Sequence, residues 1–233
     1  MILAIDSSAL SSSIALKTPH GIFEWSGDAD RVPHSEELST HINELMLRAG
    51  AAPKDLQLLV YGKGPGSFTG LRIGLSILKG ISLSLKIPIV SLSSLKAMAA
   101  SARDANGALI SGPISAIADA RRGEVFCGHF EIKGGVISAV GQEEIISFEA
   151  LNTRLSTLGA TVVFQEIIPG LQLEPSIRQE KVVGVARGLI TLVDAERAEV
   201  PAYSLEQLSP IVPTYLREVA VKTIRERMGP TLV

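Results

Sequence analysis

The first hundred positions alternate short apolar runs with clusters of small and polar residues. Residues 2–5 are continuously apolar, as expected of a strand buried on both faces, and the run ends at Asp6. After Ser35, a suitable N-cap, apolar residues recur at helical spacing as far as residue 49 and form one stripe. The other elements predicted here are strands at 12–16, 21–25, 56–61 and 87–92 and helices at 69–85 and 93–103.

The same order of elements recurs after a hinge predicted at residues 104–107. An apolar strand again ends in a carboxylate, Asp119. The elements predicted in this half are strands at 114–119, 124–130, 136–140 and 161–165 and helices at 148–158 and 176–194. The repeated βββαβα order indicates an α/β protein of two ribonuclease-H-like lobes, residues 1–105 and 106–233, in the actin-like ATPase (ASKHA) arrangement. The tail at 210–233 is predicted to end in a basic helix that either packs back on the first lobe or meets a partner.

The composition limits the classes of partner. The net charge is -2 and the sequence pI is near 6.1, so the chain has no broad basic face for a nucleic-acid backbone. Aromatic residues make up 4% of the chain, too few for a platform on which bases stack. If RNA is involved, we expect another chain to be its main reader.

The N-terminus and the cysteine content predict a cytoplasmic protein. The single cysteine, Cys127, excludes an internal disulfide and a multi-thiolate metal site and favours a reducing compartment. The first residues lack the basic region of a signal peptide. The longest apolar stretch, residues 71–85, is interrupted by Gly74, Lys79 and Gly80, so no membrane span is expected.

The most distinctive segment is the glycine-rich loop at residues 64–70, which follows a predicted strand and opens a predicted helix. That position suits anion binding by backbone N–H groups. However, the loop lacks the Gly-Lys-Ser/Thr of a P-loop, and Val90 stands where a dinucleotide-binding fold places an acid. We therefore favour a tight turn in which Gly70 and Gly74 let backbones approach closely, with nucleotide binding as the alternative.

Asp6 and Asp119 end equivalent strands, and in a two-lobed actin-like fold these ends face the interlobe cleft. Such a pair has the ligand chemistry to hold a magnesium ion through waters. The phosphate-binding turns of actin-like ATPases use glycine directly after the aspartate, whereas Ser7 and Ala120 follow it here. We favour carboxylates that cap turns, and an active ATPase or kinase remains the alternative function.

The histidines do not predict a metal centre. His34 and His41 are seven residues apart, or about 10 Å along a helix, whereas zinc-binding helices place their histidines four apart. A glycoprotease-like peptidase, the third hypothesis, therefore finds no metal ligands. Cys127 and His129 share a strand face, which lacks the electropositive field that activates a nucleophilic cysteine. We interpret Cys127 as a buried strand residue.

Eight short motifs are distributed along nearly the whole chain. They are residues 2–8, 34–36, 64–74, 79–80, 87–88, 93–95, 119–125 and 213–217. Together they resemble the TsaB (YeaZ) family of bacterial tRNA threonylcarbamoyladenosine biosynthesis proteins, which is related to TsaD. The most specific of them is the eleven-residue stretch GPGSFTGLRIG at 64–74.

The resemblance implies a two-lobed actin-like fold and a non-catalytic role. The chain would be the partner subunit required for threonylcarbamoyladenosine modification of the adenosine next to the anticodon, where it would stabilise and activate a TsaD-like transferase subunit. A TsaE-like ATPase would complete the assembly. A homodimer and a monomer are both open for the chain when it is alone. It would reach tRNA only through the complex, hold no metal or cofactor of its own, and meet ATP or ADP at the complex interface.

The resemblance also indicates candidate residues. The family's pairing surface corresponds to the predicted helices at 35–49 and 69–85. Their candidate interface residues are Ser35, Leu38, Ile42, Leu45, Met46, Leu71, Gly74, Leu75 and Leu78. Asp6, Asp119 and Arg121 are the candidates nearest a nucleotide, with a solvated turn as the alternative for Arg121, and no residue is assigned a catalytic role.

Overall fold

The computed structural model describes residues 1–27, 37–196 and 200–216. Ser35 and the tail beyond residue 216 therefore lie outside the described residues. The elements of the first half are β1 (Ile2–Asp6), β2 (Ser13–Thr18), β3 (Gly21–Ser26), α1 (Leu38–Arg48), the 3-10 helix η2 (Pro53–Asp55), β4 (Leu58–Gly62), α2 (Phe68–Leu85), β5 (Ile89–Leu92) and α3 (Ser94–Ser101). Each predicted strand and helix of this half is confirmed, with ends that differ by at most three residues.

The first half forms a five-stranded sheet in the order β3-β2-β1-β4-β5. Strand β2 runs antiparallel to both β1 and β3, and β1, β4 and β5 run parallel to one another. The β1 and β4 strands are buried along almost their entire length, which explains why their sequences are continuously apolar rather than alternating.

The second half repeats this topology. Its elements are β6 (Gly112–Arg121), β7 (Glu124–Lys133), β8 (Val136–Ala139), β9 (Glu144–Ser147), α4 (Phe148–Leu158), β10 (Thr161–Phe164), β11 (Gln179–Lys181), α5 (Ala186–Glu196) and α6 (Leu205–Leu208). The sheet order is β11-β10-β6-β7-β8, and β9 pairs with β7. The strands of the two sheets pair in the same order, with β6, β7, β8, β10 and β11 in the places of β1, β2, β3, β4 and β5. The duplicated ribonuclease-H-like unit inferred from the sequence is therefore confirmed.

One helix prediction in the second half is wrong at its start, and two short strands, β9 and β11, are not predicted from the sequence. The helix predicted at 176–194 begins only at Ala186, because Gln179–Lys181 pairs with β10 as a parallel edge strand. The β-branched residues Val182, Val183 and Val185 that precede the helix match helical spacing by chance, and they favour extended backbone. No strand was predicted at Glu144–Ser147, which is too short to give a clear pattern and is fixed by pairing with the distant strand β7.

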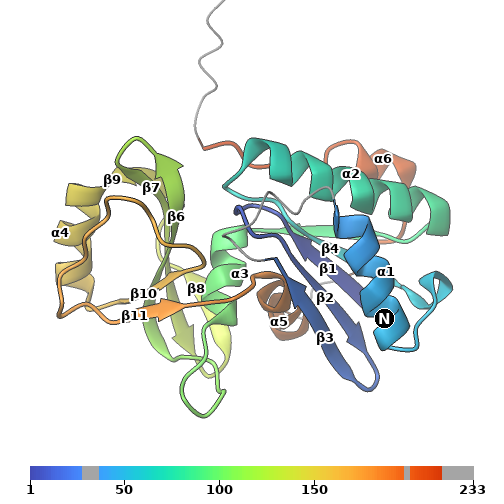
Figure 1. Cartoon of the computed structure of the whole chain (residues 1–233), viewed down its shortest axis with the longest axis horizontal. Coiled ribbons are helices and arrows are strands. Elements are labelled where there is room, and N and C mark those ends of the chain that lie inside the picture. The colour runs from blue at the N-terminus through green and yellow to red at the C-terminus, as the bar shows by residue number, and fades with distance from the viewer. Residues whose placement is uncertain (28–36, 197–199, 217–233) are drawn as a thin grey trace, which may run out of the picture.

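The helices and sheets form five layers (Figure 1). Helices α1 and α2 cover one face of the first sheet, where Leu3, Ile5 and Tyr61 point toward them. Helices α3 and α5 lie between the two sheets, and α4 covers the outer face of the second sheet. Gly188 of α5 packs so closely on Ala97 of α3 that a Cβ there would overlap the carbonyl oxygen of Ala97.

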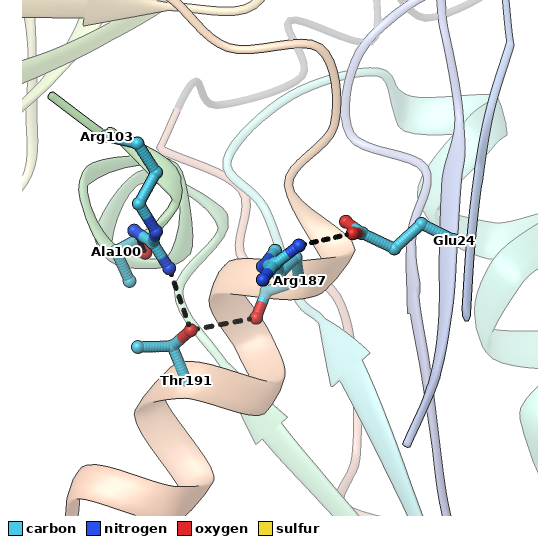
Figure 2. Close-up of polar contacts among 5 residues, drawn as sticks. All are labelled: Glu24, Ala100, Arg103, Arg187 and Thr191. Atoms are coloured by element: carbon cyan, nitrogen blue, oxygen red, sulfur yellow. Dashed lines mark hydrogen bonds and ion pairs between the residues drawn. The ribbon is translucent and has the colours of Figure 1, made fainter. Parts of the chain in front are cut away.

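Polar contacts at the rim of the α3–α5 layer join it to the first sheet (Figure 2). Arg103 donates from Nη1 to the carbonyl oxygen of Ala100 at 2.7 Å and from Nη2 to Thr191 Oγ1 at 3.4 Å. One turn earlier in α5, Arg187 Nη1 lies 2.7 Å from Glu24 Oε2 in β3. Helix α5 therefore bonds to the first lobe although it follows the second sheet in sequence; the lobe boundary at residue 105 stays a prediction.

After α5 the chain returns to the first lobe. Leu208 of α6 is buried in the same apolar cluster as α1 and α2, with Tyr203 and Ile211 packed against that cluster. The backbone N–H of Thr214 donates to the carbonyl oxygen of Lys63 at 2.7 Å. This segment holds the C-terminal part of the described chain beside the glycine-rich loop.

Candidate functional site

The glycine-rich loop packs against the serine turn that follows β1. A Cβ at Gly66 would overlap the carbonyl oxygen of Ser8, and one at Gly70 would overlap that of Ser7. The N–H of Ser67 donates to Ser8 O at 2.6 Å, and Ser67 Oγ accepts from Gly70 N at 3.2 Å as the N-cap of α2. The glycines thus allow close packing between two turns of the same chain, which agrees with the tight-turn interpretation of this loop.

Asp6 is buried at the end of β1 and accepts hydrogen bonds from three donors. Its Oδ1 accepts from the N–H of Ser8 at 3.1 Å and from Ser8 Oγ at 2.6 Å, and its Oδ2 accepts from Ser94 Oγ at 2.5 Å. Burial raises the pKa of Asp6, and the hydrogen bonds from Ser8 and Ser94 oppose that shift. The carboxylate therefore ties β1 to the N-terminus of α3, as a turn cap does.

Asp119 ends β6, and its interactions are local. Its Oδ1 accepts from the N–H of Arg121 at 2.7 Å, and its Oδ2 lies 3.0 Å from Arg121 Nη1. Arg121 and Arg122 have φ values of 66° and 60°, so they form the tight turn between β6 and β7. Among the described residues, no group of three or more His, Cys, Asp or Glu side chains is arranged to hold a metal ion.

Two carboxylates from the second lobe reach serines of the first. Ser11 donates to Glu166 Oε1 from its N–H at 2.7 Å and from its Oγ at 2.9 Å. Ser93 Oγ, at the N-cap of α3, donates to Glu143 Oε1. Burial raises the pKa of Glu143, opposed by the Ser93 hydrogen bond and by nearby Lys63 and Lys96. Neither glutamate was predicted from the sequence, because no local motif links residues that are 50 and 155 positions apart.

Cys127 and His129 lie together inside the second lobe. Cys127 Sγ is 3.7 Å from His129 Nε2, and His129 Nδ1 is 2.8 Å from Ser115 Oγ. Burial raises the pKa of Cys127 to about 12 and lowers the pKa of His129. At neutral pH the thiol is therefore protonated, whereas a nucleophilic cysteine acts as the thiolate.

The described candidate interface residues face inward. Leu38, Ile42, Leu45 and Met46 of α1 and Leu71, Gly74, Leu75 and Leu78 of α2 are all buried on the first sheet. They form the core of the lobe, so a partner that touches these helices would meet their opposite faces. The assignment of the partner surface to helices α1 and α2 stays a prediction.

The outer face of α2 carries exposed apolar residues among small and polar ones. Phe68 is 43% exposed and Leu83 is 52% exposed. A shallow hollow of about 400 Å³ lies along the first half of the helix and is lined by Phe68, Thr69, Arg72, Ile73, Ser76 and Ile77. The guanidinium of Arg72 lies 3.8 Å from the centre of the Phe68 ring, and its Nε donates to the hydroxyl of Tyr215 at 3.1 Å. The nearby helix α1 adds Leu47, which is 79% exposed.

With apolar residues on both faces, α2 is the one helix of the described chain that is long and apolar enough to cross a membrane by length and composition. The interruptions at Gly74, Lys79 and Gly80 predict no membrane span in this stretch. One face of α2 packs on β1, β4 and β5, as in the core helix of a globular domain.

These features define a class: a two-lobed actin-like α/β protein in which the turns after β1 and β6 are hydrogen-bonded to side chains of the same chain. The family model described as "TsaD: tRNA N6-adenosine threonylcarbamoyltransferase" matches residues 30–220. The chain is 39% identical to the TsaB protein of Bacillus subtilis over 60% of this chain and 58% of that protein. It is 30% identical to the TsaB protein of Escherichia coli over 84% of this chain and 82% of that protein.

Solved structures agree on the fold. A Pseudomonas aeruginosa protein described as similar to peptidase YeaZ superposes with a TM-score of 0.73 at 24% identity, covering 93% of this chain and 99% of that one. YeaZ from Pseudomonas aeruginosa gives a TM-score of 0.70 at 23% identity, covering 92% and 99%. The chain belongs to the TsaB (YeaZ) family of tRNA threonylcarbamoyladenosine biosynthesis proteins, within the TsaD-related group.

Proposed function

We propose that this chain is the non-catalytic partner subunit in the threonylcarbamoyladenosine modification of tRNA, and that it stabilises a TsaD-like transferase subunit. The observation that carries the proposal is that α2 keeps apolar side chains outside the core: Phe68 and Leu83 are exposed, and Ile73 and Ile77 are partly buried. Exposed Gly80 in the same helix has open space around it, which suits the close approach of a second helix.

The strand-end geometry supports a non-catalytic role. The carboxyl group of Asp6 accepts hydrogen bonds from Ser8 and Ser94, and the N–H and hydroxyl of Ser11 donate to Glu166. An ATPase needs such donors free for phosphate oxygens. The exposed Arg121 remains the candidate for contact with ATP or ADP at the complex interface, where its ion pair with Asp119 would have to open.

The same proposal covers the rest of the assembly. The net charge of -2 favours contact with tRNA through the complex rather than by this chain alone. A TsaE-like ATPase completes the complex in the cytoplasm, and in the absence of the transferase the exposed apolar residues of α2 pair with a second copy of the chain.

Co-purification with the TsaD-like subunit of the same organism tests the interface. Leu83→Asp and Leu47→Asp place a charge on the outer faces of α2 and α1 without entering the core. We expect each to weaken binding at least about tenfold, because a charge buried in an apolar contact is unfavourable by several kcal/mol. Leu38 and Leu75 are unsuitable for this test, since they are buried in the lobe.

The matched control is Val136→Asp, because Val136 is 60% exposed on the second lobe. This variant should bind like the wild type. Full binding by both helix variants would refute the interface. Turnover of ATP by the purified chain at about 1 per second or more would refute the non-catalytic role.

A further inference from the structure

Arg72, on the outer face of α2, is held by two aromatic side chains. Its guanidinium lies 3.8 Å from the centre of the Phe68 ring, which is one turn earlier in the same helix, and its Nε donates to the hydroxyl of Tyr215 at 3.1 Å. The ring centres of Phe68 and Tyr215 are 5.2 Å apart. Because the guanidinium is stacked on one side and hydrogen-bonded at Nε, its orientation is fixed before any partner binds.

Tyr215 is itself held by the segment that crosses the glycine-rich loop. Pro213 in this segment is buried, and the N–H of Thr214 donates to the carbonyl oxygen of Lys63 at 2.7 Å. The next residue after Tyr215, Leu216, packs against the apolar cluster between the two sheets. The hydroxyl that orients the guanidinium therefore belongs to a part of the chain that is anchored on both sides.

The positive charge of Arg72 is not neutralised within the part of the chain that the structure describes. There it forms no ion pair, and Nε is the only one of its nitrogens that donates to an acceptor. Of the six described residues that line the hollow on α2, Arg72 is the charged one, and Phe68, Ile73 and Ile77 are apolar. A partner that covers this hollow must therefore bring an acceptor for the guanidinium, because burying an unpaired charge is unfavourable.

We propose that Arg72 pairs with a carboxylate of the transferase subunit, and that Tyr215 is the residue that positions it. The inference rests on the proposed function and adds the chemistry of the partner, a helix that presents apolar side chains around one Asp or Glu. A carboxylate accepts two parallel N–H bonds from a guanidinium, which favours a guanidinium that is already oriented. A phosphate group fits less well, since phosphate sites combine several donors and no second basic side chain of the described residues lines the hollow.

The test is the Kd of the full chain for the TsaD-like subunit of the same organism, measured by isothermal titration calorimetry at two salt concentrations. Arg72→Gln should raise the Kd at least about tenfold, because it removes a charge-assisted pair. Raising the salt concentration from about 0.1 M to about 0.5 M should weaken binding of the wild type more than binding of this variant, since salt screens the pair. The matched control is Arg178→Gln, which removes an exposed arginine of the second lobe and should bind like the wild type.

A double-mutant cycle tests the role of Tyr215. Tyr215→Phe keeps the ring and removes the hydroxyl that accepts from Nε. This variant should raise the Kd about threefold in the wild-type background and leave it unchanged in the Arg72→Gln background, because the two residues act as one unit. Equal losses in the two backgrounds would show that Tyr215 does not act through Arg72, and would overturn its positioning role.

The outcomes separate this inference from the proposed function. Full binding by Arg72→Gln, with binding by Leu83→Asp still weakened, would overturn the carboxylate pair alone, whereas a wild type that does not bind the transferase subunit would refute both. A loss confined to self-association of the chain would assign the guanidinium to a homodimer and would also overturn the pair. If Arg72→Gln does not fold, Arg72→Lys provides the measurement; it keeps the charge but lacks the planar fork, and it should raise the Kd about threefold.

Discussion

Two helical glycines allow the packing between the lobes to be tested with one kind of substitution. At Gly188 of α5, an added Cβ would overlap the carbonyl oxygen of Ala97 in α3 and crowd Ser101 Oγ. At Gly80 of α2, no atom lies within 4 Å of the added Cβ. We therefore expect Gly188→Ala and Gly80→Ala to change the free energy of unfolding in opposite directions.

The magnitudes follow from two effects. Alanine is more favourable than glycine in a helix interior by about 0.8–1.0 kcal/mol, and at Gly80 nothing opposes this gain, so Tm should rise by about 2–4 °C. At Gly188 the overlap is with backbone, which cannot rotate away, so α5 must shift off α3. Overpacking of this kind costs up to about 3 kcal/mol; subtracting the helix gain leaves a loss of roughly 2 kcal/mol, or about 4–8 °C in Tm.

The assay is thermal and urea unfolding of the two variants beside the wild type, followed by far-UV circular dichroism. The Gly80 variant serves as the control for the intrinsic preference of helices for alanine. If Gly188→Ala is as stable as the wild type, or more stable, then α3 and α5 do not approach each other as described. The assignment of these helices to a packed layer between the two sheets would then be wrong.

Three further predictions concern single side chains. Burial raises the pKa of Asp6, so the contribution of Asp6 to stability is fully present below the ordinary aspartate pKa and is lost as the pH rises through the raised value. In urea unfolding at pH 3–7, the free energy of unfolding of the wild type should therefore fall with rising pH relative to that of Asp6→Asn. A difference that stays constant over this range would contradict the raised pKa. Burial raises the pKa of Cys127 to about 12. Its alkylation by iodoacetamide at pH 8 should therefore be roughly a thousandfold slower in the native chain than in urea. Equal rates in the two conditions would show that the native chain has an accessible thiolate. Ser67→Ala removes the N-cap of α2 and should lower stability by about 1 kcal/mol, whereas Ser84→Ala on the exposed side of the same helix should change it by less than about 0.5 kcal/mol.

The sequence predicted the parts of the fold that local patterns control. The run at 2–5 and the stripe of α1 are long enough, and regular enough, to indicate a buried strand and a helix without any knowledge of their neighbours. Gln179–Lys181 and Glu144–Ser147 carry no comparable pattern, because these short strands are defined by pairing with β10 and β7. Their positions are decided by the sheet rather than by their own residues.

The polar contacts of the candidate site also divide into local contacts, which the sequence predicts, and long-range contacts, which it does not. The turn caps at Asp6 and Asp119 were favoured from the residues that follow each aspartate, and their closest donors, Ser8 and Arg121, lie only two positions away. The bond between Ser11 and Glu166 spans 155 positions. Nothing in either segment indicates the other, since only the packing of one lobe against the other brings them together.

The described interface candidates lie on the apolar stripes of α1 and α2, which the structure buries in the first lobe. A regular apolar stripe marks the side of a helix that packs on its own sheet, and Leu71, Leu75 and Leu78 follow that rule. The informative signal was the number of apolar residues in α2. Beyond the buried stripe, α2 also contains Phe68 and Leu83, which do not fit the stripe and have no place in the core. A helix with more apolar residues than one face requires has a second face to bury, and in this chain that second face is the surface on which the proposed function depends.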